Sequence, residues 1–174
     1  MEDLSYPIGQ FKPEEVLSDS KRLSMIEDIK GAPAALREAV KGLSQVQLET
    51  PYRFGGWTAR QVVHHLPDSH MNAYMRFRLA LTENEPTIKP YEQQLWAELP
   101  DARTADIEMS LMLLEGLHAR WVSLLKSMTL DDFKKTFNHP ESGVQSLERT
   151  LQMYAWHGKH HVAHITSLRQ RMGW

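Results

Sequence analysis

The chain has 174 residues, with 20 Lys and Arg against 22 Asp and Glu and a formal net charge of −2. This length suits a single domain, residues 1–174, with one sizeable core. The slightly acidic balance disfavours nucleic-acid binding, which normally shows a basic surface. No run of about 18 apolar residues exists, so we expect no membrane span. The first residues lack the basic and apolar regions of a signal peptide, so we expect a cytoplasmic protein.

The sequence contains no cysteine. Disulfides, thiolate metal ligands and a cysteine nucleophile are therefore excluded. Any metal in this protein must be held by nitrogen and oxygen ligands. A thiol that takes part in a reaction must arrive with a substrate.

Apolar periodicity and helix-start signals predict four long helices. Their expected ranges are about 19–43, 59–81, 105–126 and 147–171. Gly31 and Pro33 interrupt the first range, so we expect a kink or a short break there. Thr58 and Gln61 form a capping box before the second helix.

The remaining segments connect these helices. Thr104 is expected to cap the third helix and Ser146 the fourth. Residues 82–103 contain three prolines and a short helical turn at about 91–99, and no segment shows the period of a strand. The prediction is an all-α four-helix bundle with a long crossover between the second and third helices, which then need not be antiparallel neighbours.

Four of the nine histidines lie in one short stretch of the last helix. Residues four apart share a helix face, so His157 with His161 and His160 with His164 are two potential half-sites for a divalent metal. His161 lies near the middle of the apolar stripe of this helix and His157 lies at its edge. His160 lies towards the opposite face, and His164 lies between the stripe and that face. The stripe consists of Leu151, Tyr154, Val162, Ile165 and Leu168. It favours the first pair, and the second pair is the alternative.

The second helix offers a further ligand. His65 lies beside the apolar stripe of that helix, on the side shared with Ser69, whereas His64 points further away. Pro67 removes a backbone hydrogen bond and is expected to kink the helix nearby. Such a kink could aim His65 or could be a tolerated local defect, and both readings stay open.

Together, His65, His157 and His161 would give a metal three nitrogen ligands and leave one coordination position open. That arrangement is typical of a catalytic site, because structural zinc normally has four protein ligands. The chain lacks the His-Glu-x-x-His pattern, so the metalloprotease mechanism with a glutamate base is not supported.

Several neighbours are candidates for supporting roles. Asp68 could accept an N–H from a ligand imidazole and fix its tautomer, although an Asp at such a place is more often a solvated helix residue. His64, His160 and His164 could shuttle protons or contact the ligands, with a surface position equally expected for His160.

Four larger side chains complete the candidates. Arg76 and Tyr74 could bind an anionic substrate, although an Arg on a helix is usually solvated. Trp57 and Trp156 are expected in the core or in a pocket wall, without a chemical role.

Two segments of the chain resemble one family. Gly55 to His65 with Asp68 to Asn72, and Trp156 to Ile165, resemble the DinB/YfiT-like superfamily, in particular its YfiT (bacillithiol transferase) branch. The resemblance extends from Leu4 to Trp174. It implies a four-helix bundle, a cytoplasmic homodimer and one divalent metal ion per chain, zinc or nickel.

The resemblance also implies the ligands and the chemistry. The three family ligands fall on His65, His157 and His161, whereas Pro67 stands where a small residue is expected. Members are described as metal-dependent hydrolases or as enzymes that join a low-molecular-weight thiol, such as bacillithiol, to an electrophile. In both cases the metal activates water or a thiol to attack a small electrophilic substrate.

One alternative function is a non-catalytic, stress-associated interaction module that uses the bundle to bind metal. Such a module predicts a fourth protein ligand and a closed site. Nitrogen ligands suit zinc, nickel, cobalt and copper alike, so the residue types do not select the metal.

Overall fold

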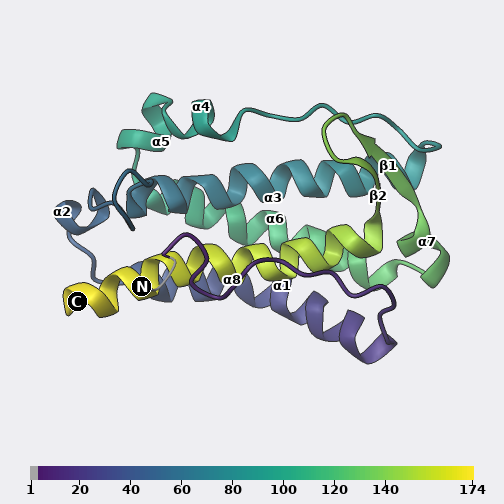
Figure 1. Cartoon of the computed structure of the whole chain (residues 1–174), viewed down its shortest axis with the longest axis horizontal. Coiled ribbons are helices and arrows are strands. Elements are labelled where there is room, and N and C mark those ends of the chain that lie inside the picture. Colours follow the sequence, from purple (N-terminus) through teal and green to yellow (C-terminus); the bar gives the residue numbers. More distant parts are fainter. Residues whose placement is uncertain (1–3) are drawn as a thin grey trace.

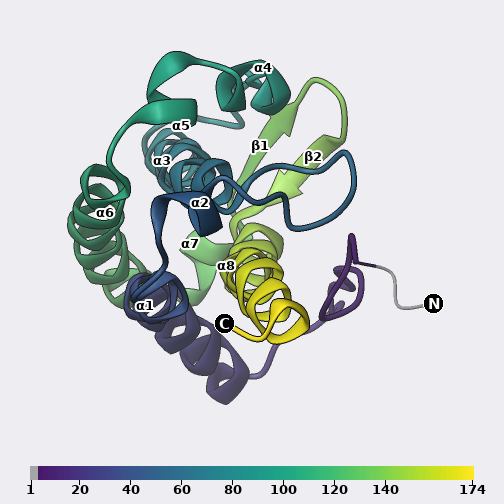
Figure 2. The ribbon, with the colours of Figure 1, turned by 90° about the vertical axis from the view of Figure 1, so that its left-hand side faces the viewer.

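Four long helices form the main body of the computed structural model, which describes residues 4–174 (Figure 1). Viewed from one end, they follow one another around a shared core in the order α1, α6, α3, α8 (Figure 2). Their bounds are Asp19–Val40 for α1, Ala59–Thr82 for α3, Ile107–Ser127 for α6 and Leu147–Met172 for α8. The predicted four-helix bundle is confirmed. No helix among the described residues is long and apolar enough to cross a membrane.

The directions of the helices explain the long crossover. In Figure 1, α1 and α8 run one way along the bundle, and α3 and α6 run the other way. Because α3 and α6 are parallel neighbours, the chain must return along the bundle between them. It does so over the outer side of α3, through the short helices α4 (Gln93–Ala97) and α5 (Pro100–Thr104).

The sequence signals for helix starts are correct at two of the long helices. Thr58 and Gln61 form the expected capping box at α3, and the Ser146 hydroxyl accepts the Arg149 N–H at 3.1 Å. The prediction that Thr104 caps the third long helix is wrong. Its hydroxyl instead donates to the Pro100 carbonyl within α5, at 2.7 Å. The carboxylate of Asp106 caps α6.

Helix α1 continues through Gly31 and Pro33, so no break occurs there. A proline inside a helix has no N–H for the carbonyl four residues earlier, which here belongs to Ile29. His118 of α6 replaces the missing donor, with its Nδ1 2.6 Å from the Ile29 oxygen. Pro67 lies within α3 in the same way, and that helix is also continuous.

The expectation of no strands is wrong. Strands β1 (Thr136–His139) and β2 (Gly143–Ser146) form an antiparallel hairpin at one end of the bundle. Each strand has only four residues, which is too short for an alternating pattern to stand out. The Asn138 carbonyl accepts the Ile88 N–H at 3.0 Å, so the hairpin also fixes the start of the crossover. Helices α2 (Gln45–Leu48) and α7 (Leu130–Lys134) complete the fold.

The apolar core consists of two clusters along the bundle axis. One contains Ile29, Phe77 and Trp121 and the other contains Leu36 and Leu114, together with their neighbours. Between the two clusters, the inward positions of α3, α6 and α8 carry histidines. A polar layer therefore crosses the middle of the bundle.

The packing predicts that Phe77→Ala lowers the free energy of unfolding by about 3–5 kcal/mol, because the ring is fully buried. Phe54→Ala is the matched control. The Phe54 side chain is fully exposed, and its removal should change stability by less than about 0.5 kcal/mol. Urea unfolding of both variants tests the prediction, which is contradicted if the two variants lose similar stability.

Candidate metal centre

Three histidines from two helices converge in the middle of the bundle. His65 comes from α3, and His157 and His161 come from successive turns of α8. One nitrogen from each ring lies within 4.8 Å of the others. The ring centroid of His65 is 5.4 Å from that of His157 and 4.7 Å from that of His161. The structure thus brings together the three residues that the sequence favoured.

The donor set fits a divalent cation. His65 Nε2 and His161 Nδ1 are buried and have no hydrogen-bond partner among residues 4–174. Buried polar atoms normally have partners, so unpaired nitrogens on two of the three converging rings fit a cation site. Burial lowers the pKa of His65 to about 3 and that of His161 well below its usual value. Both rings are therefore neutral at pH 7, which is the form that binds metals.

His157 differs from the other two because another histidine holds its second nitrogen. Its Nδ1 lies 3.0 Å from Nε2 of His70, and Nδ1 of His70 lies 2.8 Å from Nε2 of His118. His118 in turn contacts the Ile29 carbonyl on α1. The side chains of three histidines thus form a hydrogen-bonded row, the histidine file, which consists of His118, His70 and His157. This file crosses the polar layer between α1 and the candidate metal centre.

The sequence analysis gave no role to His70 and did not consider His118. A signal for both existed in the apolar stripes. His70 lies four residues after Leu66 and seven before Phe77, and His118 lies between Leu114 and Trp121 at helical spacing. A histidine at the centre of such a stripe must find partners inside the core.

Asp68 does not form the expected hydrogen bond to a histidine within the described part of the chain. The partner of His157 is His70 instead. Burial, reinforced by the negative charge of Asp101, raises the pKa of Asp68 to about 6. The Asp68 carboxyl is therefore half-buried beside the centre without touching a candidate ligand.

His64 points away from the candidate ligands, as its place on the helix indicated, but it is buried. Its Nδ1 lies 2.7 Å from the Ser110 hydroxyl and its Nε2 lies 3.3 Å from the Ala105 carbonyl, so it joins α3 to the start of α6. Its contacts are structural.

His160 and His164 are more buried than their helix positions indicated, with 6% and 3% of their surfaces exposed. Trp156 of α8 and residues from irregular segments cover these two rings. Trp156 stacks on His160 at 4.3 Å, Tyr52 stacks on His164 at 3.9 Å, and His164 Nε2 lies 3.2 Å from the Ser5 carbonyl. The expectation of a surface position for His160 is wrong, because the chain before α1 lies along α8 (Figure 1).

His160, His161 and His164 also place one nitrogen each within 4.8 Å of one another. The alternative pair from the sequence analysis therefore lies beside the favoured set and shares His161 with it. The favoured set draws ligands from two helices, whereas this second group comes from α8 alone.

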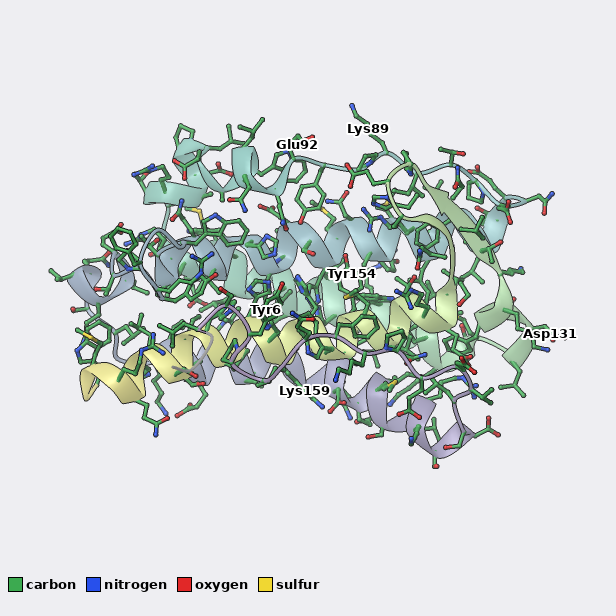
Figure 3. The ribbon with its side chains drawn as sticks, in the orientation of Figure 1. Tyr6, Lys89, Glu92, Asp131, Tyr154 and Lys159 are labelled. Atoms are coloured by element: carbon green, nitrogen blue, oxygen red, sulfur yellow. The ribbon has the colours of Figure 1, made fainter. Side chains whose placement is uncertain are left out.

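Two cavities meet at the candidate metal centre. The smaller, of about 330 Å³, has aromatic walls that include Tyr6, Trp57 and Trp156. The larger, of about 530 Å³, is lined by Arg76 and Tyr154 among others. In Figure 3, Tyr6 lies beside α8 and Tyr154 lies in the middle of the bundle. The linings that both cavities share are Gln93, Gln94 and His157.

The four larger candidate side chains separate into two groups. Trp57 and Trp156 are in a pocket wall, as expected, and the Trp57 indole donates to Gln94 on the crossover at 3.0 Å. Arg76 faces the larger cavity. Tyr74 instead belongs to the apolar core, where its hydroxyl accepts from Arg78 at 3.0 Å.

The family model of the DinB superfamily matches residues 28–165. The chain belongs to the DinB superfamily. The match covers α3, α6 and most of α8, and so includes all three converging histidines.

Curated relatives within this superfamily are similar over their full length. A protein of Bacillus cereus (strain 03BB102) is 56% identical over 174 residues, which is 100% of both chains, and is named "Putative metal-dependent hydrolase". A protein of Bacillus thuringiensis subsp. konkukian (strain 97-27), also 56% identical over the whole of both chains, carries the same description.

Solved structures agree with the fold. YfiT from Bacillus subtilis is 51% identical, covers 99% of both chains and has a TM-score of 0.97. It is described as a probable metal-dependent hydrolase with an unusual four-helix bundle topology. TT2238, a four-helix bundle protein, is 19% identical over 81% of this chain and 94% of its own, with a TM-score of 0.57, so it is similar in fold alone.

The buried histidines predict that the metal-free protein loses stability as the pH falls below about 6.5. Burial lowers the pKa of His65 to about 3 and that of His118 to about 4, below the ordinary value of 6.5. The unfolded chain therefore binds protons first on acidification, which lowers the free energy of unfolding.

Asp68 acts in the opposite direction. Its pKa is raised, so on acidification the folded chain binds a proton at Asp68 before the unfolded chain does, which increases the free energy of unfolding. This stabilising effect comes from one carboxyl, whereas the destabilising effect comes from several histidines. The melting temperature of the metal-free protein, measured at pH values from about 7.5 down to about 5, gives the net effect of the histidines and Asp68. A melting temperature that is constant or rises over this range would contradict the prediction.

Proposed function

We propose that this protein is a metal-dependent enzyme of the hydrolase type that acts on small electrophilic molecules, with His65, His157 and His161 as the metal ligands. The observation that carries the proposal is the convergence of these three rings, two of them with unpaired buried nitrogens, where two cavities meet. The names of the curated relatives support the same function class.

A divalent cation held by these side chains supplies Lewis-acid chemistry, which lowers the pKa of a water or thiol in contact with it and so favours the nucleophilic anion. The protein supplies the position and the surroundings. Three ligands leave a coordination position for a reactant, which a closed four-ligand site would not. The smaller cavity supplies aromatic walls, which include Tyr6, Trp57 and Trp156, against which a small substrate can pack.

His164 is the residue best placed to accept a proton from an entering nucleophile. A carbonyl can only accept a hydrogen bond, so Nε2 of His164 donates to Ser5 and its Nδ1 keeps a lone pair. That Nδ1 is buried and has no partner among the described residues, and the ring lines the smaller cavity. Burial lowers the pKa of His164 to about 4, so the ring is neutral at pH 7.

Thiol transfer is the second candidate, and the pair of cavities favours it. A reaction between two organic molecules needs space for both next to the reacting atoms. The smaller cavity of about 330 Å³, with its aromatic walls, and the larger cavity of about 530 Å³ both border His157. A small electrophile in one cavity and a low-molecular-weight thiol, such as bacillithiol, in the other would meet at the metal centre.

His65→Ala should abolish stoichiometric metal binding and reduce kcat/KM to the level of the metal-free protein, because two ligands on one helix cannot hold the ion alone. His64→Gln is the control, since His64 is the adjacent buried histidine and faces α6. Elemental analysis and activity assays measure both effects. A His65→Ala protein that keeps its metal and activity would end the proposal.

A substrate screen separates the two reactions. Model esters and amides test hydrolysis, and a model halo-arene with bacillithiol, cysteine or glutathione tests thiol transfer, each with intact and metal-stripped protein. We expect turnover that depends on metal in at least one set. If no substrate turns over and metal removal only lowers the melting temperature, the non-catalytic module is the better description.

Three further properties come from the family resemblance and are proposed here as predictions. They are zinc or nickel as the ion, one ion per chain, and a cytoplasmic homodimer. Elemental analysis of protein purified without added metal tests the first two. Light scattering coupled to size-exclusion chromatography tests the dimer, and a monomer at micromolar concentration would contradict it.

A further inference from the structure

We infer that His118 and His70 are positioning residues that fix the tautomer of His157, so that Nε2 of His157 is the nitrogen offered to the cation. The three histidines form a hydrogen-bonded file that begins at the Ile29 carbonyl. The role towards a cation rests on the proposed function. The tautomer of each ring does not, and it can be measured without metal.

The direction of the file is set at its α1 end. The Ile29 carbonyl oxygen can only accept a hydrogen bond, and Pro33 provides no helical N–H for it. His118 Nδ1 lies 2.6 Å from this oxygen, so the hydrogen of His118 must be on Nδ1. A proline within α1 therefore exposes the acceptor that orders the whole file.

The remaining tautomers follow ring by ring. A neutral imidazole carries one hydrogen, so Nε2 of His118 is an acceptor and Nδ1 of His70, 2.8 Å away, must donate. Nε2 of His70 is then an acceptor, and Nδ1 of His157, 3.0 Å away, must donate to it. Nε2 of His157 is left with a free lone pair.

These tautomers follow only if each ring is neutral, and the buried surroundings keep the rings neutral. His70 has no exposed surface and lies between the two apolar clusters. Burial lowers the pKa of His70 well below its usual value and that of His118 to about 4. With the tautomers given above, a second hydrogen on His118 or on His70 would point its N–H group at the N–H group of the next ring.

Packing fixes the planes of the rings. His70 and His118 stack with centroids 4.9 Å apart and planes 19° apart, and Tyr154 meets His70 edge-on at 5.1 Å. At Gly158 of α8, a Cβ atom would be 3.7 Å from Cε1 of His70, an ordinary contact, and 3.1 Å from Cβ of Ala32, a tight one. The absence of a side chain at Gly158 therefore lets α8 approach α1 closely beside His70.

The file distinguishes His157 from the other two candidate ligands. Within the described chain, neither His65 nor His161 hydrogen-bonds another residue, whereas His157 does. A partner on the second nitrogen fixes ligand orientation and raises basicity, and its loss typically reduces metal affinity by about 10–100-fold. His157 is therefore the pre-oriented ligand of the set.

Long-range 1H–15N spectra of the metal-free protein test the inference directly, because they identify which ring nitrogen carries the hydrogen. In the wild type we expect the hydrogen on Nδ1 of His118, His70 and His157. A hydrogen on Nε2 of His157 in the wild type overturns the inference.

Two substitutions at His118 separate the file from simple packing. His118→Leu offers no acceptor to His70, so we expect mixed tautomers at His70 and His157 and about 10–100-fold weaker Zn²⁺ binding by calorimetry. His118→Gln retains a side-chain carbonyl that can accept from His70, so its spectra and Zn²⁺ affinity should stay close to those of the wild type.

His64→Gln is the control for loss of a buried histidine outside the file, and it should leave the His157 tautomer unchanged. Unaltered tautomers and Zn²⁺ affinity in His118→Leu would overturn the inference. If His118→Leu does not fold, the wild-type and His118→Gln spectra still decide the matter. If the wild type binds no Zn²⁺, the proposed function fails, while the tautomers still test the file.

Discussion

The need to give every buried imidazole nitrogen a partner governs the centre of this bundle. Seven histidines are buried or half-buried around its middle, and burial keeps them neutral. A neutral ring has one donor and one acceptor, and each must be satisfied inside the protein. Within the described residues, carbonyl groups and neighbouring rings serve some of these nitrogens. Unpaired nitrogens remain on His65, His160, His161 and His164, and the rings of His65 and His161 converge with that of His157, which is why that place suits a cation.

Local rules predicted much of the fold and part of the site from the sequence. The capping boxes and apolar stripes located the long helices to within a few residues, because these signals involve only neighbours along one helix. The stripe of α8 also favoured His157 and His161 over the other pair. These two choices needed no knowledge of the tertiary structure.

Other features depend on segments that are distant in sequence. The burial of His160 and His164 comes from Tyr6, Trp156 and Tyr52, and two of these three belong to irregular segments with no periodicity. The partner of His157, His70, is on another helix, so the residue spacing within α8 gave no indication of it. The place of His118 in the apolar stripe of α6 indicated that it is buried, but a single histidine does not indicate which residues it contacts.

The mixed direction of the helices has an electrostatic consequence. Each helix carries a macrodipole whose effect is concentrated in its first and last turns. Two helices point each way along the bundle, and His65, His118 and His157 all lie more than one turn inside their helices. The opposed dipoles largely cancel at that depth. With a cation bound there, the acidity of a molecule beside it would be governed by the charge of the cation and the low dielectric around it, and the peptide backbone would contribute little.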